Sequence, residues 1–154
     1  MLDLVINPDS VRVSHSKIST QIYSDIYFQI GETFFPEEKW DDFSVIVLGW
    51  WLKEALSISS DSRSVFRFMD GPYYFEAHLI DGKCSIDFIS ERHNKKEIVS
   101  NSVIEHREFL RLLTSNARLL IRKLPFEANE FKEVLELKNN LKQLQQHAKL
   151  ITPS

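Results

Sequence analysis

This sequence of 154 residues is poor in cysteine and glycine, and each shortage argues against a class of protein. Cys84 is the only cysteine, so no disulfide can form within the chain, and no Cys-x-x-Cys pair is available to bind zinc. The 4 glycines form neither a G-x-S-x-G nucleophile motif nor a phosphate-binding loop. We therefore expect neither a disulfide-stabilised secreted protein nor an enzyme built on those motifs.

Long apolar segments are absent as well. The longest runs from Val45 to Leu52, far short of the roughly 20 residues that a membrane-spanning helix needs. Residues 1–8 lack the basic segment and the apolar run of a secretory signal. We expect a cytoplasmic protein with no membrane partner.

The remaining composition is that of a globular protein, with 43% hydrophobic and 27% charged residues. The 11 Phe and 3 Trp provide large side chains for a core. The length, together with the absence of linkers and repeats, favours a single domain over residues 1–154.

The net charge of −3 hides an asymmetry along the chain. Residues 1–91 carry 7 Lys and Arg against 15 Asp and Glu, a net charge of −8, whereas residues 92–154 carry 12 against 7, a net charge of +5. This split suits either two unlike partners or two faces of one domain that attract each other, and we favour the second explanation. Overall negative charge argues against nucleic acid as a partner.

Residues 19–30 have the period-two alternation of a β-strand, and Val11 and Val13 indicate a shorter strand before it. The dipeptides Asp70-Gly71 and Asp81-Gly82 are typical of hairpin turns and predict a three-stranded antiparallel meander over residues 64–90. One face of this meander is apolar and the other polar, so we expect one face in the core and one in solvent.

Three helices are expected. Residues 41–57 predict a buried helix with Asp41 as its N-cap. A capping box at Ser102–Glu105 predicts the start of a helix over residues 102–124, and a narrow apolar stripe predicts an outer helix over residues 129–149. The expected fold class is therefore α+β, an antiparallel meander with helices packed on one face.

Recognisable catalytic chemistry is not evident. His78 and Cys84 are close in sequence, but they fall on opposite faces of the predicted meander and so cannot share a metal. Cys84 lies on the apolar face, where a thiol is usually inert. We predict no metal site, no cofactor and no enzymatic activity.

The first candidate partner-binding patch surrounds a tryptophan. Its residues are Glu37, Glu38, Trp40, Asp41 and Asp42. The carboxylates suit the start of a helix, which is the explanation we favour. They also suit an acidic surface with an aromatic anchor that meets a basic protein.

The second candidate patch lies on the polar face of the meander and contains Arg67, Tyr74, Glu76 and Asp87. The predicted register places Glu76 directly opposite Asp87, and facing like charges are destabilising unless a cation lies between them. Arg67 and His78 are neighbours that can supply this cation. Pairing within the sheet is therefore the simpler role for these residues, and contact with a partner is the alternative.

Four segments, together spanning roughly residues 20–125 in order, carry a family resemblance: Ile26–Gly31, Phe35–Phe43, Leu48–Leu52 and Phe68–Tyr73. In these segments the sequence resembles a family of small bacterial proteins often found as immunity partners of polymorphic toxins. The resemblance implies stoichiometric binding and neutralisation of a cognate toxin without catalysis. The family has no shared binding residues that could be carried over to this chain.

Three other functions remain open. A small-ligand or regulatory binding domain would need a pocket lined by aromatic residues with a few converging polar groups. An enzyme of unrecognised type would need a cleft that holds clustered titratable residues. A self-assembling structural protein would use the polar sheet face, which retains Tyr74 and Ile80.

Overall fold

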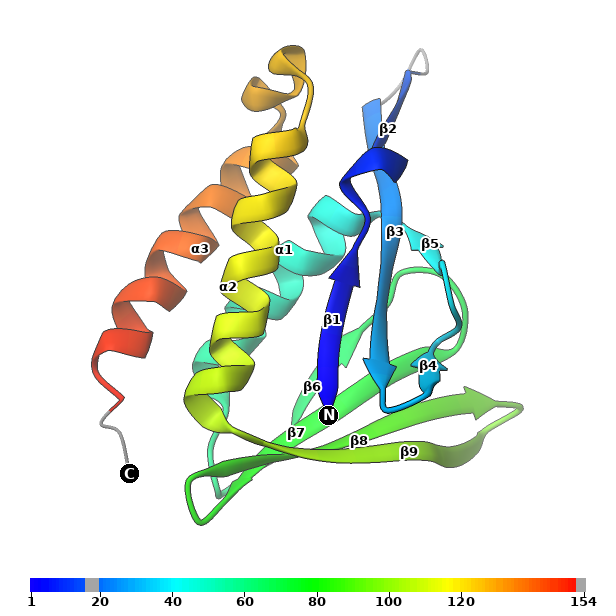
Figure 1. Cartoon of the computed structure of the whole chain (residues 1–154), viewed down its shortest axis with the longest axis vertical. Helices are drawn as coiled ribbons and strands as arrows, with labels where there is room; N and C mark the ends of the chain where they lie inside the picture. The colour runs from blue at the N-terminus through cyan, green and yellow to red at the C-terminus, as the bar shows by residue number, and fades with distance from the viewer. Residues whose placement is uncertain (16–19, 152–154) are drawn as a thin grey trace.

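The computed structural model describes residues 1–15 and 20–151. It contains two antiparallel β-sheets and three α-helices, which confirms the α+β class expected from the sequence. Figure 1 shows the helices gathered on one side of the molecule, the first sheet beside them and the second sheet across one end. Within the described residues, every helix is too short or too polar to cross a lipid bilayer.

The first sheet is built around the long strand β3 (Thr20–Ile30). One part of β3 pairs with β1 (Leu2–Ile6) and the other part with β2 (Arg12–His15). The short strands β4 (Thr33–Phe35) and β5 (Asp41–Asp42) also pair with β3. All four pairings are antiparallel, so β3 organises the whole sheet.

The strand predicted over residues 19–30 is confirmed as β3 for residues 20–30, and residue 19 lies outside the described residues. Of the shorter strand expected at Val11 and Val13, Val13 lies in β2 and Val11 precedes it. Strand β1 was not predicted. Its residues Leu2, Leu4 and Ile6 are buried and alternate with more exposed neighbours. This segment of five residues is a strand because β3 supplies its hydrogen-bonding partner, which a local pattern does not reveal.

The second sheet is a meander of β6 (Ser64–Arg67), β7 (Tyr73–Ile80), β8 (Lys83–Arg92) and β9 (Lys95–Glu105), in that order. The predicted register of the first three strands is confirmed, with Phe75 opposite both Phe66 and Phe88 and with Leu79 opposite Cys84. The turn at Asp81-Gly82 joins β7 to β8 with positive φ angles at both residues, as a type I′ hairpin requires.

The prediction of a capping box at Ser102–Glu105 was wrong, because these residues form the end of β9. Ser102 pairs with Ile86 and Ile104 pairs with Cys84 in the neighbouring strand β8. Pairing with a long strand over ten positions outweighs the local preference of Ser and Glu for a helix start. Helix α2 therefore begins only at His106.

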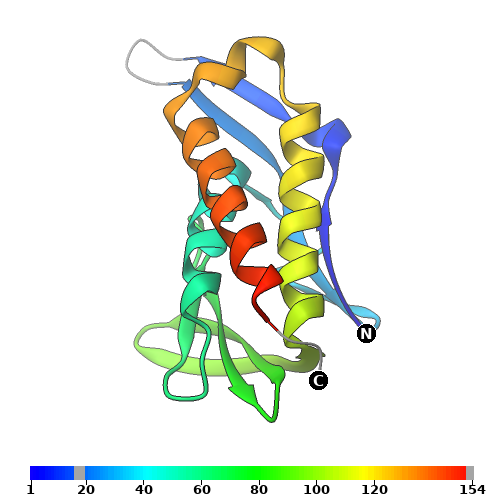
Figure 2. The ribbon, with the colours of Figure 1, turned by 90° about the vertical axis from the view of Figure 1, so that its left-hand side faces the viewer.

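The helices are α1 (Ser44–Glu54), α2 (His106–Lys123) and α3 (Lys132–Lys149). A 3₁₀ turn, Ala55–Ser57, follows α1, and another, Phe126–Glu130, links α2 to α3. Figure 2 shows α2 and α3 running antiparallel beside each other, and their residues are in contact. The outer helix expected over residues 129–149 is thus confirmed, with a start three residues later.

The predicted helix over residues 41–57 exists in its central part only. Asp41 is not an N-cap, because Asp41 and Asp42 form strand β5, and Phe43 precedes the first helical residue without a side-chain cap. Hydrogen bonding of this segment to β3 outweighs its capping propensity.

The core joins both sheets to helix α1 through one aromatic residue. The ring of Phe28 in β3 lies 4.9 Å from the ring of Phe75, 5.3 Å from that of Phe88 and 5.7 Å from that of Trp51 in α1. All four side chains are buried. Aromatic contacts at these separations add to the free energy gained by burial alone.

Candidate functional site

The solvent face of the first sheet combines aromatic and acidic side chains. Along β3, partly exposed residues alternate with buried ones, so Tyr23, Asp25 and Tyr27 all point away from the core. The ring of Tyr23 lies 4.5 Å from that of Phe43, and the ring of Tyr27 lies 5.8 Å from that of Phe34. Two aromatic pairs therefore flank a carboxylate on this face.

A second carboxylate lies directly opposite the first. The pairing of β3 with β5 places Asp25 opposite Asp41. Arg12 Nη2 lies 2.7 Å from Asp41 Oδ2, and both side chains of this ion pair are about half exposed. Burial raises the pKa of Asp25 above 3.8 and the negative charge of Asp41 raises it further, whereas Arg12 and Lys39 oppose the increase.

The turn before β5 adds more negative charge at the edge of this face. Glu37 and Glu38 are exposed, and neither forms an ion pair among the described residues. Burial raises the pKa of Tyr27, and the negative charge of Glu38 raises it further, because both disfavour the phenolate anion. We define the acid–aromatic face as Tyr23, Asp25, Tyr27, Phe34, Glu37, Glu38, Asp41 and Phe43.

Asp42 was expected in a partner-binding patch, but the structure buries it completely. Its carboxylate accepts hydrogen bonds from the Phe43 amide at 2.8 Å, from Trp40 Nε1 at 3.2 Å and from the Asp70 amide at 3.3 Å. The ring of Trp40 is half buried and meets that of Tyr73 edge-on at 5.2 Å. Asp42 and Trp40 therefore hold the acidic turn against the second sheet, and Asp42 offers no surface to a partner.

The second expected patch, on the polar face of the meander, is less exposed than the alternation of side chains along its strands indicated. Glu76 does lie opposite Asp87, as predicted, but Glu76 and Tyr74 retain only 7% and 6% of their accessible surface. The cations that balance the two carboxylates are Lys96, at 2.6 Å from Glu76, and Arg63, at 3.1 Å from Asp87. Arg67 and His78, which were expected to supply these cations, form neither of the two ion pairs.

The polar face of the second sheet is less exposed than expected because β9 and β6 bring further side chains onto it. Arg67 lies over the ring of Tyr74 at 4.9 Å, and the Tyr74 hydroxyl donates a hydrogen bond to Glu91 at 3.3 Å. Asn101 of β9 also donates to Asp87, at 2.7 Å. The patch of Arg67, Tyr74, Glu76 and Asp87 is thus largely satisfied within the sheet, which is its simpler expected role.

Cys84 is fully buried on the apolar face of the second sheet, and burial raises its pKa to about 12, so the thiol remains protonated at neutral pH. Within residues 1–15 and 20–151, no group of three or more His, Cys, Asp and Glu side chains is arranged to hold a metal ion.

Comparison with known proteins yields no match, either among protein-family models, among curated sequences or among solved structures.

The acid–aromatic face contains residues that the sequence did not single out. Alternation alone placed Tyr23, Asp25 and Tyr27 on the outer side of a strand. It did not show that Asp41 lies beside them, because the pairing of β3 with β5 joins residues 16 positions apart. Of the five residues expected around Trp40, the structure brings Glu37, Glu38 and Asp41 to the surface and keeps Asp42 inside.

Proposed function

We propose that this protein is a non-catalytic inhibitor of the immunity type, which binds a cognate bacterial toxin and neutralises it. In this proposal the acid–aromatic face meets a basic surface of the toxin. The observation that carries the proposal is the like-charge pair formed by Asp25 and Asp41 on neighbouring strands.

Directly opposed carboxylates destabilise a folded protein when no cation compensates them. Here Arg12 binds Asp41 from one side, and the pKa of Asp25 is still raised by burial and by the charge of Asp41. A basic partner would add positive charge beside Asp25, which forms no ion pair of its own among the described residues. The pair therefore supports a surface suited to association with a basic protein.

The neighbouring aromatic residues suit the same role. Tyr and Phe side chains at the centre of an interface contribute much of its binding free energy, and surrounding charges accelerate association with an oppositely charged protein. Tyr23 and Tyr27 are held by Phe43 and Phe34, so little side-chain entropy is lost on binding.

The test is to express the products of the genes adjacent to this one, alone and together with this protein. We expect one product to arrest growth when expressed alone, and we expect co-expression to restore growth and give a complex that purifies at equal stoichiometry. If none of these products is toxic and none forms a complex, the proposal of an immunity function is wrong.

Charge reversal tests the surface within the same assay. We expect Glu37→Lys with Glu38→Lys to slow association with the toxin about tenfold at low salt, because electrostatic steering is lost. Glu127→Lys with Glu130→Lys is the matched control, since it makes the same charge change in the turn between α2 and α3. Equal effects of the two pairs would contradict the assignment of the acid–aromatic face, while rescue by the unmodified protein would still support the function.

A further inference from the structure

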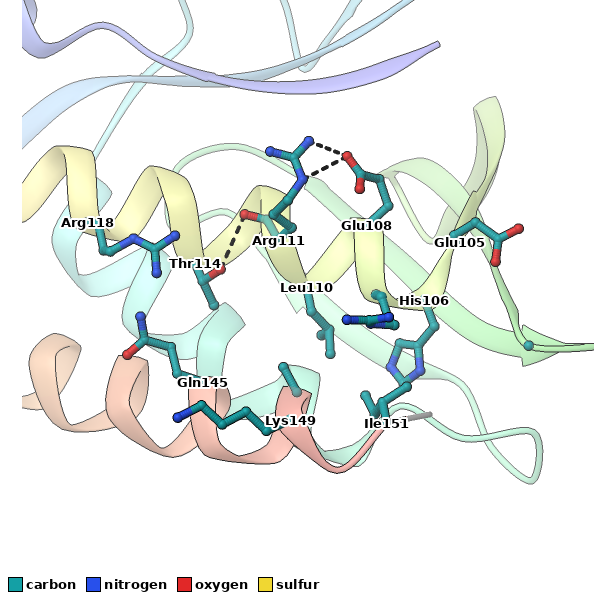
Figure 3. Close-up of a pocket in the computed structure, with 13 residues that line it drawn as sticks. Glu105, His106, Glu108, Leu110, Arg111, Thr114, Arg118, Gln145, Lys149 and Ile151 are labelled. Carbon is teal, nitrogen blue, oxygen red and sulfur yellow. Dashed lines mark hydrogen bonds and ion pairs between the residues drawn. The ribbon is translucent and has the colours of Figure 1, made fainter. Parts of the chain in front are cut away.

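A cavity of about 880 Å³ lies between helices α2 and α3. This volume is within the range of small-molecule sites. Figure 3 shows Leu110 and Thr114 of α2 directed toward α3, Gln145 of α3 directed toward α2, and His106 beside Ile151. The cavity is separate from the acid–aromatic face, because its lining comes from α2, α3 and the adjoining residues Gly82, Glu105 and Ile151 and includes no residue of that face.

One end of the cavity is apolar. Leu110, Ala148 and Ile151 line it, together with His106. His106 is 8% exposed, and its Nε2 atom is buried without a hydrogen-bond partner among the described residues. Burial lowers the pKa of His106 below 6.5, and the charge of His147 lowers it further, so the imidazole ring itself is neutral at neutral pH. The apolar side chains at this end suit the hydrocarbon part of a ligand.

The other end carries unpaired positive charge. Arg118 lines this end, and Figure 3 shows the Lys149 side chain extending along α3 toward it. Arg107 also lines the cavity but lies beside His106 in the first turn of α2. Within residues 1–15 and 20–151, none of these three cations forms an ion pair. Both acidic residues of the lining are already engaged. Arg111 binds Glu108 on the side of α2 that faces away from α3, and Lys83 lies 3.9 Å from Glu105.

The helix dipoles do not decide the charge preference of this site. The N-terminal turn of α2 and the C-terminal turn of α3 both border the cavity, and their partial charges are opposite in sign and similar in size. The side chains therefore set the electrostatic potential, and three cations without carboxylate partners make it positive.

We infer that this cavity binds a small amphipathic organic anion, with one carboxylate between Arg118 and Lys149 and an apolar body against Leu110, Ala148 and Ile151. The carboxylate would accept charge-assisted hydrogen bonds, which are stronger than neutral ones. The hydrocarbon would cover apolar surface that is otherwise open to water. This inference does not depend on the toxin-binding proposal, because the two use different surfaces.

The test is a titration of the full chain with octanoate, followed by NMR chemical shifts or calorimetry. We expect saturable binding with a Kd of about 1 mM or tighter, with shifts confined to α2 and α3. Octan-1-ol and inorganic phosphate are the two comparison ligands, since the first lacks the negative charge and the second lacks the hydrocarbon chain. Both should bind at least about tenfold more weakly. No binding of octanoate, or equal binding of either comparison ligand, would overturn the inference.

Three variants distinguish binding in this cavity from nonspecific attraction of anions to positive charge on the surface. Arg118→Gln should weaken octanoate binding about three- to tenfold, because a direct charged contact is lost. Ala148→Phe should abolish binding with every charge intact, because it fills the apolar end. Lys53→Gln, which removes an exposed cation from α1, is the matched control and should leave the Kd unchanged. Equal effects of Arg118→Gln and Lys53→Gln would reject the cavity as the site, and circular dichroism would verify that each variant is folded.

Discussion

At the scale of single residues, Asp42 was expected at the surface from its acidic neighbours in the sequence, but its carboxylate stabilises the fold from inside. The side chain is fully buried, and burial raises its pKa above 3.8 although three donors bind it. Those donors belong to the start of α1, to the indole of Trp40 and to the turn before β7. One carboxylate thereby connects its own neighbours, Trp40 and Phe43, to a turn that lies 28 residues further along the chain.

Asp42→Ala should lower the free energy of unfolding by about 2–4 kcal/mol, because three donors lose their acceptor in a region that excludes water. Urea unfolding followed by fluorescence measures this change. Asp41→Ala is the matched control, since its half-exposed ion pair with Arg12 contributes less than about 1 kcal/mol. A loss of the same size in both variants would show that Asp42 is not the anchor described above.

His106 predicts a dependence of stability on pH. Its pKa in the folded protein lies below 6.5, its ordinary value, because the ring is buried and lies near His147. Between 6.5 and the lower folded pKa, the unfolded chain therefore binds more protons than the folded one. The contribution of His106 to stability is complete above pH 6.5 and decreases as the pH falls through this window.

Unfolding in urea at about pH 7.5 and about pH 5.5 tests this dependence. We expect His106→Gln to reduce the loss of stability between the two pH values, and His93→Asn, at an exposed turn position with positive φ, to leave that loss unchanged. The prediction is wrong if the loss of stability in His106→Gln equals that of the unmodified protein.

At the scale of secondary-structure elements, two glycines illustrate opposite requirements. Gly82 has a φ of +80° in the turn between β7 and β8, a conformation that side chains with a Cβ rarely adopt. Gly49 lies within α1 at an ordinary helical φ, and a Cβ added there would meet no atom within 4 Å. The first glycine is required by the turn, and the second only weakens its helix.

Substitution by alanine should therefore change stability in opposite directions. Gly82→Ala should lower the free energy of unfolding by about 1 kcal/mol or more, whereas Gly49→Ala should raise it by about 0.5–1 kcal/mol. Thermal unfolding of the two variants beside the unmodified protein measures both changes. A decrease in Tm for Gly49→Ala would mean that α1 needs the glycine for a contact that its empty surroundings do not reveal.

At the scale of the whole molecule, Phe28 connects the two sheets and α1 within one core. Because these layers share the same buried contacts, we expect the chain to unfold in one cooperative transition, with coincident curves from far-UV circular dichroism and tryptophan fluorescence. Phe28→Ala should lower the free energy of unfolding by about 3–5 kcal/mol. Phe126→Ala, at a ring that is 90% exposed, is the control and should have almost no effect.

Two separate transitions would show that the sheets are independent units and would contradict the expectation of a single domain over residues 1–154. A single transition that Phe28→Ala hardly shifts would show instead that the cooperativity has another origin, such as the packing of α3 on α1.

The sequence by itself determined the elements whose signals are local. The register of β6, β7 and β8 followed from two turn dipeptides and a period of two, and the same period placed Tyr23, Asp25 and Tyr27 on one side of β3. Turn geometry and side-chain alternation act between close neighbours, so they can be read without knowledge of the fold.

The tertiary structure decided the features that depend on strand pairing across the chain. It placed Asp41 beside Asp25, buried Asp42, and extended β9 through residues that favour a helix start. It also placed between α2 and α3 a cavity in which Arg107, Arg118 and Lys149 have no ion-pair partner among the described residues. These outcomes depend on which distant segments meet, and the free energy of those contacts exceeds the local preferences that a sequence displays.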